Sequence, residues 1–181
     1  DTLSSLYSQS HCLDVDPAFT LEVVVVDSSV DPQSCDFLER LKKSSINIAY
    51  LRDFPPQGIY PAMNLGLAAT TGDWILFLNS GDAFFDVTSL SRLLQCCFNF
   101  RSRHGFNPTA IFGQALICPQ HGSSCKPWLV PDPAVHSIRR WLSIYYPNHQ
   151  SLLVDGSWAR PHPFQVDAPQ SADRVWMRAA L

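Results

Sequence analysis

Residues 58–82 constrain the fold most strongly, because they combine a helical pattern, a short turn and a buried strand. The strand is marked by the unbroken apolar run I-L-F-L at 75–78, which is typical of a strand covered on both faces. The polar segment 79–82 follows at the carboxyl end of this strand, where open α/β sheets place their ligands. A carboxylate there, Asp82, beside a glycine that allows a tight turn, Gly81, suits a divalent cation that carries a phosphorylated ligand.

Strand and helix patterns alternate through the amino-terminal part of the chain. Apolar runs predict strands at 21–27, 46–51, 73–79 and 109–117, and spaced apolar residues predict helices at 31–43, 59–70 and 87–100. Alternation of this kind implies right-handed crossovers between parallel strands. The sequence therefore predicts an α/β fold with a mostly parallel sheet flanked by helices.

The chain changes character after Cys118. Prolines crowd the segment 119–169, with aromatic residues scattered between them. This composition predicts a loop-rich half that lies over the sheet rather than a second domain. Because 181 residues are the size of one domain, we expect a single domain over residues 1–181, with an α/β half at 1–117 and a loop-rich half at 118–181.

Composition argues against several classes of function. The net charge of -3 provides no basic field, so we expect no nucleic-acid partner. No apolar run approaches the roughly 20 residues that span a bilayer, and the first residues show no signal-peptide pattern. The six cysteines form no C-x-x-C pair, which favours reduced side chains over the alternative of a zinc site or a disulfide framework. These features predict a globular protein in a reducing compartment, the cytoplasm.

Two aspartates that follow predicted strands are candidates for ligand binding. Asp27 ends the first strand, where its carboxylate can accept hydrogen bonds from a nucleobase or a ribose; a turn or a helix cap is the alternative. Asp82 ends the strand of the 58–82 segment, where a carboxylate can hold Mg²⁺ or Mn²⁺ against the oxygens of a nucleoside diphosphate. Capping of the following turn is the alternative for Asp82.

Three polar residues of the loop-rich half are further candidates. His149 and Gln150 precede the apolar run 152–154, and an imidazole beside a carboxamide can bind sugar hydroxyls or phosphate oxygens. A structural histidine is the alternative. Asp173 begins an expected carboxyl-terminal helix, where its carboxylate can serve as a general base or, alternatively, stabilise the helix dipole.

The order of five segments resembles the family 2 glycosyltransferases, in the form found in bacterial surface-polysaccharide assembly. These segments are L-E-V-V-V-V-D ending at Asp27, G-I-Y-P-A-M-N-L-G at 58–66, T-G-D-W-I-L-F-L-N-S-G-D closing on Asp82, N-H-Q-S-L-L-V at 148–154 and A-D-R-V-W-M-R from Ala172. The resemblance implies a GT-A fold and an inverting transfer of a sugar from a UDP-, GDP- or dTDP-linked donor to a saccharide or lipid-linked acceptor. It also implies Mg²⁺ or Mn²⁺, and a lipid-linked acceptor would imply peripheral association with the inner face of the membrane.

The resemblance also implies a role for each candidate on the donor side. Residues 1–117 would bind the nucleotide, with Asp27 at the nucleobase or ribose and Asn64 in the donor pocket. Asn79 and Asp82 would occupy the family's metal-binding acidic motif, with Asp82 as the main protein ligand.

On the acceptor side, the resemblance implies three further roles within residues 118–181. His149 and Gln150 would line the acceptor or the diphosphate. Asp173 would be the base that deprotonates the acceptor hydroxyl.

Departures from the family pattern keep an alternative open. Pro56 and Pro61 stand where relatives tend to have acidic residues, and proline supplies neither a charge nor a backbone donor. The family's opening strand is not found before the helical pattern that begins this sequence, so we expect a domain truncated at its amino terminus. The alternative is a non-catalytic GT-A-like domain that binds a nucleotide or a protein partner.

Overall fold

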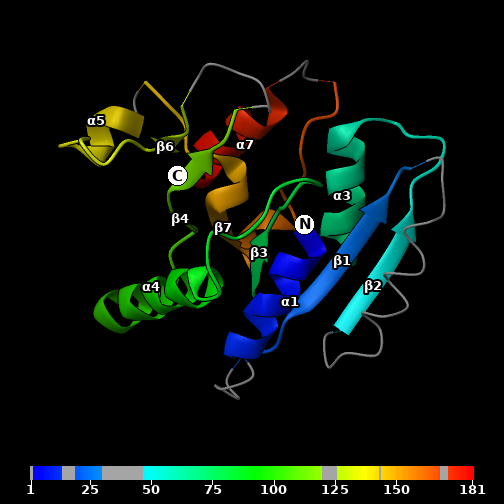
Figure 1. The fold of residues 1–181 in the computed structure, drawn as a ribbon, viewed down its shortest axis with the longest axis horizontal. Helices are drawn as coiled ribbons and strands as arrows, with labels where there is room; N and C mark the ends of the chain where they lie inside the picture. Colours follow the sequence, from blue (N-terminus) through cyan, green and yellow to red (C-terminus); the bar gives the residue numbers. More distant parts are fainter. Residues whose placement is uncertain (1, 14–18, 30–46, 120–125, 143, 168–170) are drawn as a thin grey trace.

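The computed structural model describes residues 2–13, 19–29, 47–119, 126–142, 144–167 and 171–181, which form a mixed α/β fold (Figure 1). The helices are α1 (Thr2–Leu13), α3 (Ile59–Ala69), α4 (Ser89–His104), α5 (Ile138–Leu142), the 3-10 helix η2 (His149–Ser151), α6 (Gly156–Ala159) and α7 (Ala172–Ala180). The strands are β1 (Glu22–Asp27), β2 (Asn47–Arg52), β3 (Trp74–Leu76), β4 (Ala110–Phe112), β5 (Ala115–Ile117), β6 (Trp128–Val130) and β7 (Leu152–Asp155). The helix predicted at 31–43 lies outside the described residues.

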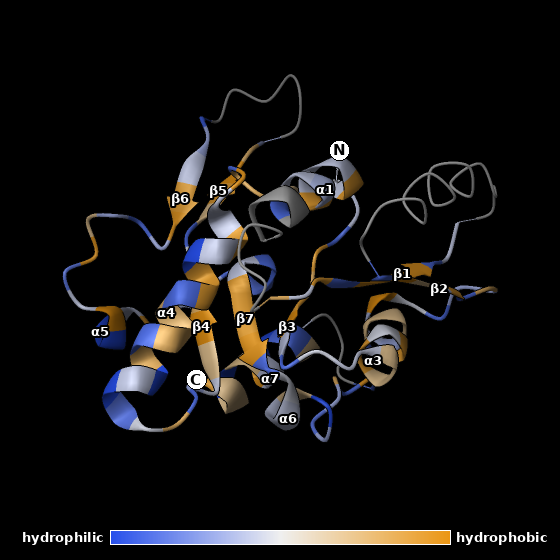
Figure 2. Ribbon diagram, turned by 90° about the horizontal axis from the view of Figure 1, so that it is seen from below, coloured by the Kyte–Doolittle hydropathy of each residue, from blue (hydrophilic) through white to orange (hydrophobic). Residues whose placement is uncertain are grey.

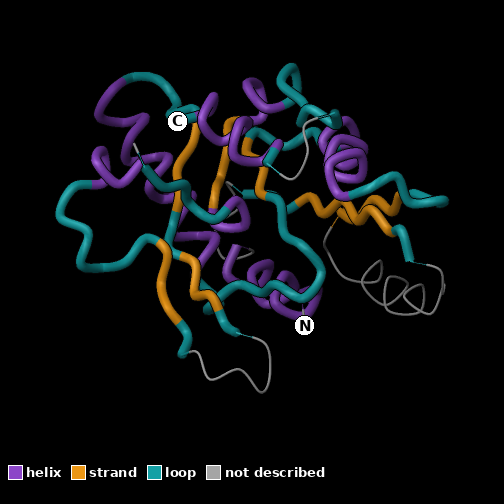
Figure 3. Tube along the Cα trace, turned by 90° about the horizontal axis from the view of Figure 1, so that it is seen from above, coloured by secondary structure: helices purple, strands orange, loops and turns teal. Residues whose placement is uncertain are grey.

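The strands of the described residues form three separate groups (Figure 3). β1 and β2 pair in parallel, with Glu22 opposite Asn47 and Asp27 opposite Arg52. β7 lies between β3 and β4 and is antiparallel to both. β5 and β6 form an antiparallel pair. The α/β class is therefore confirmed, but in the part of the chain that is described only a small parallel pair exists, not the mostly parallel sheet that the sequence predicts.

The half from 118 to 181 contributes more to the core than the sequence predicts. It contains β7, the middle strand of the group β3-β7-β4. The strand predicted at 109–117 is divided, because the chain leaves β4 at Gly113, whose N–H bonds the carbonyl of Ser151 at 2.9 Å, and then pairs β5 with β6. Local apolar patterns show which residues are buried, but they do not reveal the direction or the partner of a strand.

β7 is buried on both faces, which explains its uninterrupted apolar run (Figure 2). Leu152 and Val154 join a core cluster formed largely by α3 and α7, whereas Leu153 joins a second cluster formed largely by α4. The alternation of a strand thus sends successive side chains into two layers of helices. Burial of one such side chain contributes about 1.5–3 kcal/mol. Among the described helices, none combines the length and the hydrophobicity that a membrane crossing requires.

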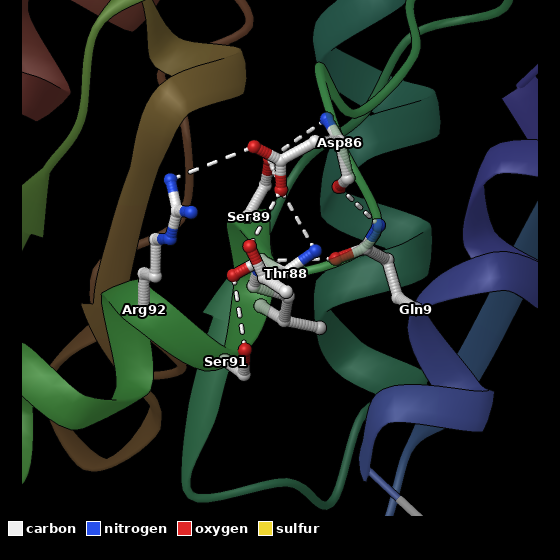
Figure 4. Close-up of polar contacts among 7 residues, drawn as sticks. Gln9, Asp86, Thr88, Ser89, Ser91 and Arg92 are labelled. Carbon is white, nitrogen blue, oxygen red and sulfur yellow. Dashed lines mark hydrogen bonds and ion pairs between the residues drawn. The ribbon is translucent and has the colours of Figure 1, made fainter.

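Helix α1 is fastened to the start of α4 by one buried glutamine, Gln9 (Figure 4). Its Nε2 donates to the carbonyl of Asp86 at 2.8 Å, and its Oε1 accepts from the N–H of Leu90 at 3.0 Å. The Asp86 side chain also accepts from the N–H of Thr88 at 2.8 Å. These bonds satisfy N–H groups at the helix start that have no partner within the helix. α1 and α4 therefore hold each other in place.

Candidate active site

The antiparallel pairing of β3 with β7 decides which segments meet at the candidate site. Leu76, the last residue of β3, lies opposite Leu153, near the start of β7. The segment 79–82 that follows β3 therefore meets η2, the segment that immediately precedes β7. The contact between Asn79 and His149 joins residues that are 70 positions apart in the chain.

The turn at 79–82 is tight and is supported by α1. The N–H of Asp82 donates to the carbonyl of Asn79 at 3.1 Å, and the N–H of Gly81 donates to the hydroxyl of Thr2 at 2.9 Å. Gly81 has a φ of 97°, in the left-handed region that glycine adopts readily. The tight turn that the sequence predicts at Gly81 is confirmed, and it keeps Asn79 and Asp82 close together.

His149 connects this turn to helix α7. Its Nε2 lies 3.3 Å from Nδ2 of Asn79, and its Nδ1 lies 3.4 Å from Oδ2 of Asp173. Burial lowers the pKa of His149 below its ordinary value of 6.5, although the carboxylates of Asp173 and Asp82 act in the opposite direction. The ring is therefore neutral near pH 7, and the two contacts assign its tautomer. Nδ1–H donates to Asp173, while Nε2 accepts from the amide of Asn79.

Asp173 is approached by donors from two different elements. Its Oδ2 faces His149 of η2, and its Oδ1 accepts a hydrogen bond from the hydroxyl of Tyr60, in the first turn of α3, at 3.0 Å. Burial raises the pKa of Tyr60, and the hydrogen bond to Asp173 raises it further, so the phenol remains protonated and donates. The Asp173 side chain is 21% exposed. A carboxylate that is held in place but open to solvent can take a proton from a hydroxyl group.

Asp82 is held by the glutamine that follows His149. Nε2 of Gln150 donates to Oδ2 of Asp82 at 2.9 Å. Oε1 of Gln150 is buried and has no hydrogen-bond partner in the described part of the chain. A buried acceptor without a partner is uncommon, and its oxygen can accept from a donor or bind a cation. The structure thus gathers five of the predicted site residues into one cluster: Asn79, Asp82, His149, Gln150 and Asp173.

We expect the fold to lose stability as the pH falls below the ordinary pKa of His149, 6.5. Because the folded-state pKa of His149 is lowered, the unfolded chain binds more protons below that pH, and the stabilisation that is complete above it is lost progressively. The slope from this one group is at most about 1.4 kcal/mol per pH unit. Urea unfolding at about pH 7.5 and about pH 5.5 measures the loss of unfolding free energy between these pH values.

Two variants separate the contribution of His149 from that of other groups. His149→Gln removes the titrating ring and should reduce the loss of unfolding free energy between the two pH values. His104→Gln, which removes an imidazole at an exposed position near the end of α4, is the control for the substitution itself. An undiminished pH dependence in His149→Gln would show that other groups cause it.

Asp27 lies in a different group of strands, at the carboxyl end of β1. Its carboxylate is 12% exposed and accepts hydrogen bonds from the hydroxyl of Tyr50 at 2.5 Å and from Nη1 of Arg52 at 2.9 Å, both on β2. The N–H of Ser29 donates to its other oxygen at 2.8 Å. Asp27 is thus engaged by its neighbours, and Arg52, with 37% of its side chain exposed, extends this polar edge toward solvent. Its contact with a nucleotide stays a prediction.

Asn64 holds the backbone of the residue that packs against Tyr60, Phe164. Its Nδ2 donates to the carbonyl of Phe164 at 2.8 Å, and its Oδ1 accepts from the N–H of the same residue at 2.8 Å. The Phe164 ring stacks on Tyr60, with 5.9 Å between the ring centroids. The structure places Asn64 against the backbone of Phe164, and its predicted role in the donor pocket stays a prediction.

The donor set near the turn suits a cation that is completed by its ligand. In the described residues, no group of three or more His, Cys, Asp or Glu side chains could hold a metal ion. Asp82 offers one carboxylate, and the neighbouring Asn79 and Gln150 carry amide oxygens. Mg²⁺ prefers oxygen ligands and commonly uses one or two carboxylates together with substrate phosphates and water. The unpartnered Oε1 of Gln150 fits this chemistry, whereas a cage made by the protein alone does not form here.

Sequence reasoning missed Tyr60, Tyr50 and Arg52. Tyr50 and Arg52 alternate along a strand and so share one face, a pattern that the sequence contains. What the pattern lacks is the register that sets Arg52 opposite Asp27. Tyr60 lies within the segment 58–66 but contacts a residue 113 positions away, and no local signal points to that partner.

The model of the family described as "Glycosyl transferase family 2" matches residues 1–95. A "PGL/p-HBAD biosynthesis glycosyltransferase" of Mycobacterium bovis is 29% identical over 72 residues, which cover 40% of this chain and 28% of the relative. A protein of the same description from Mycobacterium tuberculosis gives the same values. The match thus spans less than a third of the length of these relatives. No solved structure shows a significant match.

Proposed function

Because the chain belongs to glycosyl transferase family 2, we propose that it moves a sugar from a nucleotide-diphosphate sugar to an acceptor hydroxyl with inversion at the anomeric carbon. Membership of the family implies a GT-A fold, a sugar donor and an acceptor. The observation that carries the proposal is the cluster at the end of β3, where Asp82 and Asp173 lie on either side of the pair His149–Gln150. The names of the mycobacterial relatives support glycoconjugate or polysaccharide biosynthesis as the setting.

Asp173 is the general base of the proposed reaction. It takes the proton of the acceptor hydroxyl while that oxygen forms a bond to the anomeric carbon, and the bond from that carbon to the diphosphate breaks on the opposite face. The transition state resembles an oxocarbenium ion, as in glycoside hydrolysis. The partial exposure of Asp173, 21%, supports access of an acceptor to its carboxylate.

The donor side is built around Asp82. Asp82 would hold Mg²⁺ or Mn²⁺, and such an ion offsets the negative charge of the departing nucleoside diphosphate. Asn79 and Gln150 flank this carboxylate and contribute polar contacts to the diphosphate or the acceptor. Asp27, with Arg52 beside it, would bind the nucleobase or the ribose at the edge of β1 and β2.

We expect the protein to act in the cytoplasm. The cysteines Cys96, Cys97 and Cys118 are free thiols, which agrees with a reducing compartment. A saccharide acceptor would be met in solution. A lipid-linked acceptor would bring the protein to the inner face of the membrane.

The proposal is tested by screening donors. Thermal unfolding is measured with UDP-, GDP- and dTDP-sugars in the presence of manganese, since a ligand that binds only the folded state raises the Tm. We expect one nucleotide class to raise the Tm, and that donor to be consumed when an acceptor is added. The absence of a shift with all three classes would contradict the proposal.

A non-catalytic domain is the second candidate, and the proline substitutions favour it. Pro56 and Pro61 remove charge near the start of α3, and Asp82 is the one carboxylate of the turn 79–82. Such a domain would bind a nucleotide sugar, with a rise in Tm, but would release no nucleoside diphosphate with any acceptor.

A further inference from the structure

We propose that Tyr60 is a positioning residue for Asp173, whose hydroxyl fixes the orientation in which the carboxylate meets the acceptor hydroxyl. This inference rests on the proposed function, because it assigns Tyr60 to the reaction in which Asp173 is the base. Its basis is the hydrogen bond of 3.0 Å from the Tyr60 hydroxyl to Oδ1 of Asp173. That bond joins the first turns of two helices, α3 and α7.

The Tyr60 ring is itself held rigidly. It stacks on Phe164 with an interplanar angle of 21°, and Phe164 is 3% exposed. Two hydrogen bonds from the Asn64 side chain fix the backbone of Phe164 at 2.8 Å each. Because the ring is packed on a buried and anchored neighbour, its hydroxyl has little freedom, which is the property that a positioning group requires.

The two oxygens of Asp173 are held unequally. Oδ1 lies 3.0 Å from the Tyr60 hydroxyl, whereas Oδ2 lies 3.4 Å from Nδ1 of His149. The shorter bond therefore sets the rotation of the carboxylate. Oδ2, with its longer and weaker contact, keeps a lone pair for the proton of the acceptor.

The titratable groups that face Asp173 come from two elements. Tyr60 belongs to α3, and His149 belongs to η2 and also experiences the charge of Asp82. Removal of the Tyr60 hydroxyl should therefore leave the Asp173 carboxylate free to rotate away from the orientation in which Oδ2 meets the acceptor hydroxyl.

The test compares Tyr60→Phe with a matched control, Tyr145→Phe. Tyr145 is 57% exposed and its ring contacts Trp141, so the control removes a hydroxyl at an exposed position. We expect Tyr60→Phe to lower kcat by about tenfold, as the loss of a bond to a charged group implies. KM for the donor should stay near that of the parent protein, so that the defect falls on kcat.

A second measurement does not depend on turnover. In protein labelled with ¹³C at the aspartate carboxyls, the Asp173 signal, assigned by its loss in Asp173→Asn, should change its chemical shift in Tyr60→Phe but not in Tyr145→Phe, because only the first variant removes the donor to Oδ1. An active parent whose kcat and Asp173 chemical shift are both unchanged in Tyr60→Phe would overturn this inference and leave the proposed function intact. An inactive parent whose Asp173 signal nevertheless shifts in Tyr60→Phe would overturn the proposed function and support the contact between Tyr60 and Asp173.

Discussion

Asp173→Asn is expected to lower kcat by about 100- to 10,000-fold, the range that general-base catalysis contributes, while donor binding is retained. An asparagine keeps the size of the side chain, and its Oδ1 can still accept the hydrogen bond from Tyr60 that Asp173 receives at 3.0 Å. The fold should therefore persist. What is lost is the ionised oxygen that takes the proton from the acceptor, so the defect falls on the chemical step rather than on affinity for the donor.

Steady-state release of nucleoside diphosphate measures kcat, and calorimetric titration with the donor measures affinity. Asp167→Asn, at an exposed position before α7, is the matched control and should keep the parent rate. If Asp173→Asn keeps about 10% or more of the parent rate, the assignment of Asp173 as the base is wrong.

Asp82→Asn is expected to abolish the stimulation by manganese and to reduce transfer by at least about 100-fold, because a bound cation supplies several kcal/mol of charge stabilisation to the transition state. This variant is a more specific test of the charge than Asp82→Ala, because its amide oxygen can still accept the hydrogen bond that Gln150 donates to Asp82 at 2.9 Å. Only the negative charge is removed. Binding of Mn²⁺, followed by electron paramagnetic resonance, should weaken together with the activity.

The comparison with Asp82→Ala separates charge from packing. Asp82→Ala also leaves Nε2 of the partly buried Gln150 without its partner and should lower the Tm, which Asp82→Asn should not. Full activity in manganese for both variants would eliminate Asp82 as the anchor of the cation, and the Mg²⁺ or Mn²⁺ site would have to be sought elsewhere.

Much of the candidate site could be predicted because its residues follow local signals. Asp82 stands after an apolar strand and a glycine, and Asp173 stands at a helix start, so each is marked by the pattern around it. No local sequence pattern points to Tyr60, because its role depends on a contact with Asp173, which lies 113 positions away in the chain. Asn64 illustrates the opposite case. It lies in a segment that resembles the family motif, but its side-chain amide forms hydrogen bonds with the backbone of Phe164.

From its own residues the chain determined the strands β1, β2 and β3, the helices α3, α4 and α7, and the tight turn at Gly81. These are local properties, set by the spacing of apolar side chains and by the conformational freedom of glycine. Only the tertiary structure decided that β7 runs antiparallel between β3 and β4, and thus that His149 meets Asn79 and Asp173. The physical reason is that β7 must bury both of its faces, and the helices that cover them come from distant parts of the chain.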